Sequence, residues 1–264
     1  MGEDCADLGG PRKEWIRLVL KEIKAKYFDL GLRALMSKEY YYVGQMFAIA
    51  MLQNGQMPSF LSEALIKDLI SAKSNDSCIK QIQQGMETLG MHSALQKFPQ
   101  LLYLLRPGGQ NRGLNVQKLL QLVKPVFSEE GSNSLKFEKE TYQVFIKYIR
   151  EVAANRRASG NVKITLNHIL QFITAASEEP VLGFVQNPQC KFVLPKEDRI
   201  EDPNASQESS EKVYKTVVSF TPSSHTCINV LNLPRATHIH ALPNSETLYS
   251  LYDLCFGQDY FGIQ

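Results

Sequence analysis

The residues best suited to chemistry lie near the C-terminal end of the chain, where residues 221–227 read Thr-Pro-Ser-Ser-His-Thr-Cys. The polar character of this segment predicts a turn, and the apolar, β-branched residues at 228–233 predict a strand directly after it. Cys227 is therefore expected at the rim of a strand, where its thiol is accessible. An accessible thiolate is a nucleophile that can accept an acyl group as a thioester.

Two side chains beside Cys227 are candidates to support that chemistry. His225 and Thr226 can donate hydrogen bonds near the sulfur or lower the thiol pKa. The alternative for His225 is an exposed turn histidine that only orients the backbone, and spacing does not separate the two interpretations. Cys227 has an alternative too, because cysteine is among the most buried residue types and often acts as a small apolar side chain.

The elements that must position these residues follow from the spacing of apolar residues. Helical periodicity predicts helices at 14–23, 41–54, 61–70, 79–89, 114–127, 137–154, 165–175 and 245–254. Short β-branched and aromatic runs predict strands at 181–185, 191–194, 216–220 and 228–233, forming one small sheet. Cys255 falls on the apolar stripe of the closing helix and is expected in the core. The run 101–105 fits either state.

Two polar segments interrupt this pattern. Residues 128–134 contain Ser, Glu, Gly and Asn without periodicity, and we interpret this stretch as a hinge between two lobes. Residues 197–212 are rich in Ser, Glu, Asp and Asn and are expected to form a mobile surface loop.

Composition excludes several classes of function. The 264 residues are 44% hydrophobic with a net charge of +2, which indicates a large core but no strong field for nucleic acid or a membrane surface. The longest apolar segment, 43–52, is too short to span a bilayer, and no signal peptide is recognised at the N-terminus. Five scattered cysteines without a Cys-x-x-Cys pair favour reduced thiols, and hence the cytoplasm or nucleus.

No cofactor or metal site is expected. His238 and His240 lack a third ligand at metal-binding spacing, and the Gly-Gly pairs lack the further residues of a phosphate-binding loop. A separate motif, Arg156-Arg157-Ala158-Ser159, resembles a site for basophilic kinases on an inter-helix loop. Its alternative is an ordinary solvated basic loop.

The order Ser-His-Thr-Cys-x-Asn-x-Leu-x-Leu-Pro over residues 224–234 resembles the C-terminal lobe of HECT ubiquitin ligases. In that family the phenylalanine four places from the C-terminus is a second landmark, and Phe261 matches it. Residues 7–15 also resemble an N-lobe motif with Gly-Gly, a basic pair, Glu and an aromatic. One local departure is Ile228, where an aromatic is usual.

The resemblance implies an α+β, two-lobed fold: a partial helical N-lobe at 1–127, a hinge at 128–136 and a C-lobe at 137–264. It also implies that Cys227 accepts ubiquitin and passes it to a substrate lysine, supported by His225, Thr226 and Phe261. The implied partners are ubiquitin, a ubiquitin-conjugating enzyme and a protein substrate, with no nucleic acid and no membrane. By itself, Phe261 is also compatible with a tail aromatic that merely packs on the lobe.

The chain also departs from the family pattern. Residues 71–77 lead directly into the next family helix at 79–82, so the subdomain that docks the conjugating enzyme is expected to be missing. The chain starts near the Gly-Gly-Pro motif, without the first part of the usual N-lobe, which suggests a fragment, a divergent member or an incomplete gene model. The shortened middle and Leu182-Gly183-Phe184 with Pro188 look most like the divergent group related to mitotic phase-specific ligases.

Two functional hypotheses therefore stand beside each other. The first is a HECT-type ubiquitin-protein transferase acting through Cys227. The second is a catalytically silent HECT-like module that binds protein partners. A cysteine hydrolase is disfavoured because no His and Asp or Asn partners of the thiol can be assigned from the sequence.

Overall fold

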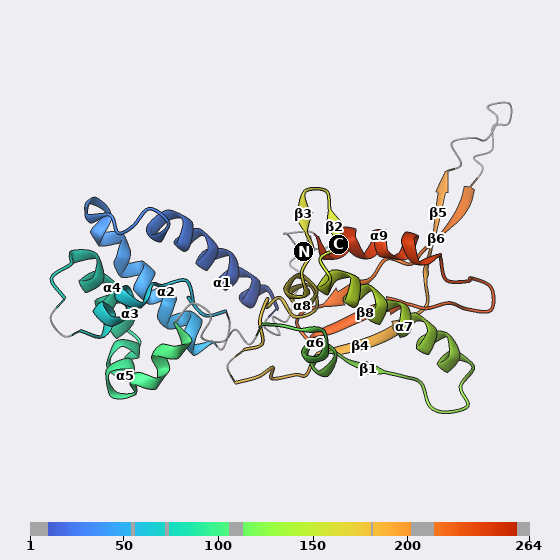
Figure 1. Cartoon of the computed structure of the whole chain (residues 1–264), viewed down its shortest axis with the longest axis horizontal. Coiled ribbons are helices and arrows are strands. Elements are labelled where there is room, and N and C mark those ends of the chain that lie inside the picture. The colour runs from blue at the N-terminus through green and yellow to red at the C-terminus, as the bar shows by residue number, and fades with distance from the viewer. Residues whose placement is uncertain are drawn as a thin grey trace, which may run out of the picture. The chain divides into compact units, whose positions relative to one another are not determined.

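The structure is a computed structural model that describes residues 10–53, 56–71, 74–105, 113–180, 182–201 and 214–257. The chain divides into two compact units (Figure 1). The first unit comprises Met1–Leu114 with Ala175–Val185, and the second comprises Asn115–Thr174 with Gln186–Gln264.

The regular elements described in the first unit are helical. They are α1 (Gly10–Ile23), the π-helical turn η1 (Lys24–Phe28), the 3-10 helix η2 (Ala34–Glu39), α2 (Tyr40–Leu52), α3 (Glu63–Ile70), α4 (Ser77–Glu87), α5 (Met91–Lys97) and the 3-10 helix η3 (Pro99–Leu104). Side chains cap two of the starts: Ser62 accepts a hydrogen bond from the backbone N–H of Leu65, and Asp76 from that of Cys78. Such caps satisfy N–H groups that have no partner inside the helix.

The core of the first unit forms where α2 crosses α4. Tyr40 and Phe47 are fully buried there, together with Met86. Glycines allow the two backbones to touch, because a Cβ at Gly44 would collide with the carbonyl oxygen of Ile82. The predicted helix at 14–23 is confirmed, but Trp15 is 51% exposed and the buried face is Ile16, Leu20 and Ile23.

The second unit combines helices with a mixed sheet. Its helices are α6 (Val116–Leu122), α7 (Asn133–Ala153), α8 (Leu166–Thr174) and α9 (Ser245–Phe256). Its strands are β1 (Lys124–Val126), β2 (Ala158–Ser159), β3 (Val162–Lys163), β4 (Gln189–Val193), β5 (Lys196–Glu201), β6 (Tyr214–Ser219), β7 (Ser223–His225) and β8 (Val230–Pro234).

Four of these strands form the main sheet, in the order β1-β4-β8-β7. β4 runs parallel to both β1 and β8, whereas β7 pairs antiparallel with β8. Strand β8 is one of the two inner strands, and Leu231 and Leu233 in it are fully buried. The pairs β2–β3 and β5–β6 form two separate antiparallel hairpins.

Aromatic side chains join the helices of the second unit. Tyr148 of α7 packs edge-on against Tyr252 of α9, and Phe256 of α9 packs against Phe172 of α8. α8 in turn contacts β7 and β8. At the other side of α7, Tyr142 contacts Phe192 of β4. The helices thus pack against the sheet and bury its inner strand β8.

Several predicted elements differ in the structure. The helix expected at 114–127 ends at Leu122, because Pro125 has no N–H to donate and disfavours helix at the residue before it, so 124–126 joins the sheet as β1. The described residues 182–185 are not a strand. The strand predicted at 216–220 appears as β6, but it pairs with β5 in a hairpin outside the main sheet.

The described residues of the two polar segments include regular structure. Residues 197–201 of the expected surface loop belong to β5, and 202–212 lie outside the described residues. The segment 128–136, interpreted as a hinge, lies within the second unit. There Glu138 accepts hydrogen bonds from the N–H and hydroxyl of Ser128 at 2.7 and 2.6 Å, and α7 begins at Asn133. The lobe boundaries remain a prediction.

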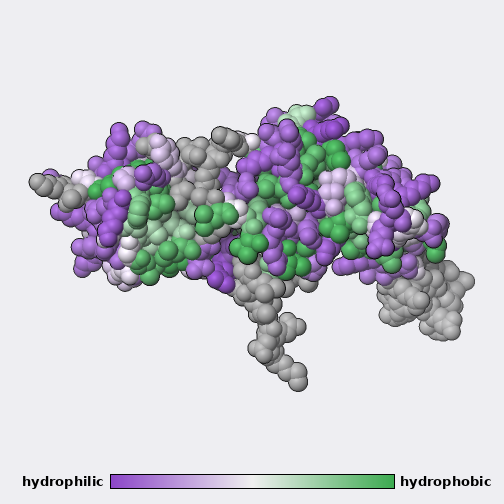
Figure 2. Space-filling view, turned by 90° about the horizontal axis from the view of Figure 1, so that it is seen from below, coloured by the Kyte–Doolittle hydropathy of each residue, from purple (hydrophilic) through white to green (hydrophobic). Residues whose placement is uncertain are grey.

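The surface mixes polar and apolar side chains. On the face drawn in Figure 2, hydrophobic residues lie interspersed among hydrophilic ones. In the part of the chain that the structure describes, no helix combines the length and the apolar character that crossing a bilayer requires.

Candidate functional site

Cys227 lies in the four-residue turn 226–229 that connects β7 to β8. The turn closes through the backbone N–H of Ile228, which donates to the carbonyl oxygen of His225 at 3.2 Å. His225 is also the residue that pairs with Val230 at the base of the hairpin. The Cys227 side chain is half-buried. A short loop on a buried strand is a position where a side chain is both accessible and held by the scaffold.

Asn229 anchors this turn. It was not among the site residues predicted from the sequence. Its side chain is 2% exposed, and its φ of 54° lies in the left-handed region. Its Nδ2 donates to the carbonyl oxygen of Gln186 at 2.6 Å, and its own carbonyl accepts from the N–H of Gln189 at 2.9 Å. Together these bonds tie the cysteine turn to the segment that enters β4. Asparagine adopts the left-handed backbone conformation more readily than most residues, so an asparagine directly before the predicted strand was a sequence signal for such a turn.

The Oδ1 atom of Asn229 is buried without a hydrogen-bond partner among the described residues. The cost of leaving a buried acceptor unsatisfied is about 1–3 kcal/mol. The side-chain amide of Asn229 is thus satisfied at its nitrogen, which bonds to Gln186, and unsatisfied at its oxygen.

The other predicted site residues are placed as follows. His225 is exposed at the end of β7, and Thr226 is half-buried in the turn. Within the residues that the structure describes, neither side chain makes a hydrogen bond to the sulfur of Cys227. Phe261 lies outside the described residues. The supporting roles of these three residues remain predictions.

The other described cysteines have environments that favour the neutral thiol. Cys190 in β4 is fully buried and Cys78 in α4 is 1% exposed; burial raises the pKa of both. Burial also raises the pKa of Cys255 to about 11. Cys255 was expected in the core; it is half-buried, and its sulfur lies 3.7 Å from the carbonyl oxygen of Pro222. A thiol with a raised pKa holds little thiolate at neutral pH and is a poor nucleophile.

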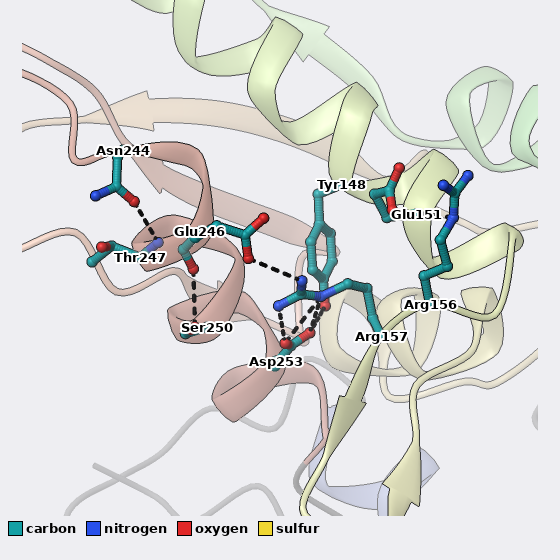
Figure 3. A network of polar contacts seen from close by, with 9 residues as sticks. All are labelled: Tyr148, Glu151, Arg156, Arg157, Asn244, Glu246, Thr247, Ser250 and Asp253. Atoms are coloured by element: carbon teal, nitrogen blue, oxygen red, sulfur yellow. Dashed lines mark hydrogen bonds and ion pairs between the residues drawn. The ribbon is translucent and has the colours of Figure 1, made fainter.

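A polar network fixes α9, the helix that precedes the C-terminal residues (Figure 3). The buried carboxylate of Asp253 accepts a hydrogen bond from the hydroxyl of Tyr148 at 2.9 Å and forms an ion pair with Arg157. Arg157 also lies 3.6 Å from the carboxylate of Glu246 and 5.2 Å from the ring centre of Tyr249. The network joins α9 to α7 and to the segment that enters β2.

The two histidines considered for metal binding, His238 and His240, contact other side chains of the same unit. Nε2 of His240 lies 3.0 Å from a carboxylate oxygen of Glu197, and the ring of His238 packs edge-on against Phe137. Across the described ranges, no three His, Cys, Asp or Glu residues gather in a group that could hold a metal ion.

Comparison with known proteins gives one family. No curated protein matches the chain. The family model of the HECT-domain (ubiquitin-transferase) matches residues 72–243, which is more than half of the chain and includes β4, β8 and the turn that carries Cys227. The match does not extend to the Gly-Gly-Pro segment or to Phe261. On this match, the chain belongs to the HECT-domain (ubiquitin-transferase) family.

Proposed function

We propose that this chain is a HECT-type ubiquitin-protein transferase that carries ubiquitin as a thioester on Cys227. The observation that supports it is the position of Cys227, in a turn within the matched region, directly before β8, an inner strand of the sheet. Cys255, the other half-buried cysteine among the described residues, lies outside the matched region, and burial raises its pKa.

The proposed reaction has two acyl transfers. In the first, the thiolate of Cys227 attacks the carbonyl carbon of the ubiquitin thioester on the conjugating enzyme; a new carbon–sulfur bond forms and the thiolate of that enzyme leaves. In the second, a neutral substrate lysine attacks the Cys227 thioester, forming an amide as the Cys227 thiolate leaves and the ammonium proton passes to solvent or a base. Exchange between two sulfurs changes bond energy little, so access matters more than strong electrostatic stabilisation.

In this proposal the neighbours of Cys227 have supporting roles. His225 and Thr226 influence the thiol by hydrogen bonding when ubiquitin is bound, and Phe261 helps to position the thioester for the lysine. We also propose that the chain belongs to the divergent, shortened group that resembles mitotic phase-specific ligases, on the strength of Leu182-Gly183-Phe184 and the short middle of the chain.

The test is a loading assay on a non-reducing gel with activating enzyme, a panel of conjugating enzymes, ubiquitin and ATP. We expect a thiol-sensitive ubiquitin adduct that Cys227→Ala abolishes. Cys255→Ala is the matched control, because it removes a half-buried thiol of the same unit, and its adduct should persist. An adduct that survives in Cys227→Ala, or that both variants lose while remaining folded, would contradict the assignment.

A second candidate function is a catalytically silent module that binds ubiquitin or a target protein. The observation that favours it is the link from α3, ending at Ile70, to α4, starting at Ser77, which leaves no room for the subdomain that docks the conjugating enzyme. This hypothesis expects binding of ubiquitin by a well-folded chain that no conjugating enzyme loads. Loading of Cys227 by any member of the panel would reject it.

A further inference from the structure

The hairpin β2–β3, which follows α7 and precedes α8 in the chain, projects beside α8 and the end of α9 (Figure 1). Each strand contributes two residues, and Ala158, Gly160 and Lys163 are exposed. A hairpin with so few pairs is marginal by itself. It can therefore open locally, as a segment must when it enters the active site of a modifying enzyme.

The first strand of this hairpin ends the run Arg156-Arg157-Ala158-Ser159. The side chain of Arg156 is 66% exposed and lies 3.3 Å from a carboxylate oxygen of Glu151. An ion pair so exposed contributes about 0–1 kcal/mol, so Arg156 can leave it for an acidic partner at little cost. Arg156 is thus exposed just before the hairpin, whereas Ser159, at the end of β2, is half-buried.

Ser159 itself packs against the end of α9. A Cβ placed on Gly257 would collide with the Cβ of Ser159 and would lie 3.0 Å from its hydroxyl oxygen. Gly257 closes the last turn of α9 through its backbone N–H, which donates to the carbonyl oxygen of Asp253 at 2.9 Å. A large group on the Ser159 hydroxyl therefore either displaces this turn or swings the hairpin away from it.

The charges around this contact disfavour an added anion. Asp253 is buried one turn before Gly257, and the C-terminal end of a helix carries partial negative charge. The guanidinium of Arg157, two residues before Ser159, is already paired with Asp253 (Figure 3). A phosphate dianion on Ser159 would repel Asp253 and compete with it for Arg157.

We propose that Ser159 is a phosphorylation site and that its modification releases the C-terminal turn of α9. In the reaction, the Ser159 hydroxyl oxygen forms a bond to the γ-phosphorus of ATP, the bond from that phosphorus to ADP breaks, and the hydroxyl proton passes to the base of the kinase. The phosphate then draws Arg157 from Asp253 and excludes Gly257 from its contact.

The first experiment tests the site. The full chain is incubated with ATP and a purified kinase that selects serine after two arginines, and phosphate is located by mass spectrometry of the intact protein and its peptides. We expect one phosphate on Ser159, none in Ser159→Ala, and a rate at least tenfold lower in Arg156→Ala. A folded chain that takes no phosphate, or takes it on another residue, overturns the proposal.

The second experiment tests the consequence by hydrogen exchange of the phosphorylated chain. Amides of residues 253–257 should exchange at least tenfold faster, whereas those of α4 in the first unit should not change. Unchanged exchange at 253–257 overturns the release of α9. Neither experiment uses ubiquitin, so both outcomes are independent of the proposed transferase activity.

A third variant tests the contact without any charge. Gly257→Ala adds a Cβ that meets the side chain of Ser159 and lies 2.8 Å from the carbonyl oxygen of Asp253, and it should also speed exchange at the end of α9. The double variant Gly257→Ala, Ser159→Gly removes the opposing Ser159 side chain and leaves the Asp253 contact, so it should restore part of the protection. If the double variant exchanges as fast as Gly257→Ala, the contact on which the proposal rests is not what holds this turn.

Discussion

The conformation of Asn229 governs how Cys227 is presented. The turn needs a residue with positive φ two positions after the cysteine, and the amide of Asn229 adds a bond to Gln186, 43 residues away in the chain. Backbone conformation and side-chain hydrogen bond are thus combined in one residue. Substitutions can separate them, because glycine accepts the left-handed conformation without a side chain and alanine resists it.

We expect Asn229→Ala to have a free energy of unfolding about 1 kcal/mol below that of Asn229→Gly, because both lose the same hydrogen bond and the same unsatisfied Oδ1, and only alanine strains the turn. Urea denaturation checks the stabilities. The rate at which iodoacetamide modifies Cys227, followed by peptide mapping, should change more in Asn229→Ala than in Asn229→Gly. Equal stabilities and equal rates for the two variants would mean that the left-handed conformation does not constrain the turn.

At the scale of elements, the α2–α4 crossing depends on two glycines. A Cβ at Gly44 meets the backbone of Ile82, and a Cβ at Gly85 meets the backbone of Tyr41, both closer than real Cβ contacts. In an isolated helix, replacing glycine by alanine stabilises by up to about 1 kcal/mol. At this crossing the sign reverses, because backbone atoms of a packed helix cannot move aside as a flexible side chain does.

We expect Gly44→Ala and Gly85→Ala each to lower the free energy of unfolding of the first unit by at least about 2 kcal/mol, as overpacking does. Gly113→Ala is the control, since a Cβ there meets nothing within 4 Å and its φ is not positive. It should stay within about 0.5 kcal/mol of the parent chain. Urea denaturation followed by circular dichroism measures all three. A neutral Gly44→Ala would show that the two helices can separate without loss.

At the scale of the whole molecule, buried tyrosine and cysteine side chains make the free energy of unfolding depend on pH in the alkaline range. Burial raises the pKa of Tyr142 to about 12 and that of Cys255 to about 11, and it raises the pKa of Tyr148, Tyr252 and Cys190 as well. All five lie in the second unit. Their neutral forms are favoured by folding, so the unfolded chain ionises first as the pH rises.

We therefore expect stability from these groups to be complete below about pH 8.5, where the thiols and phenols of the unfolded chain are neutral, and to decline as the pH rises toward 12. Thermal unfolding followed by circular dichroism at pH 7.5 to 11, under reducing conditions, measures the decline. Tyr252→Phe removes one buried phenol and should show a shallower decline than the parent chain. A melting temperature that is constant up to pH 11 would argue against these pKa shifts.

The local pattern of apolar, capping and turn residues was sufficient to predict many of the helices and strands. The helix predicted at 165–175 is α8, Thr165 caps it through a hydrogen bond from the N–H of His168, and Ala175 follows it with a left-handed φ of 58°. The spacing of apolar residues also predicted the closing helix, which is α9, and the strands at 191–194 and 228–233, which are β4 and β8. These features depend on residues within a few positions of one another, which is why a sequence read in order reveals them.

The contacts that assemble the site could not be predicted from local sequence patterns. Arg157 and Asp253 are 96 residues apart, and nothing in either local pattern selects the other as partner. The same holds for Asn229 and Gln186, and for the pairing of β5 with β6 instead of the main sheet.

The sequence by itself determined the helical periods, the turn before the apolar strand at Cys227 and the motif that resembles HECT ligases, because these are properties of neighbouring residues. Only the tertiary structure decided which cysteines are buried and so hold a raised pKa, which carbonyl anchors Asn229, and that Ser159 meets Gly257. The physical reason is that burial, strand pairing and buried ion pairs are set by the packing of distant segments against one another, and no local propensity encodes that packing.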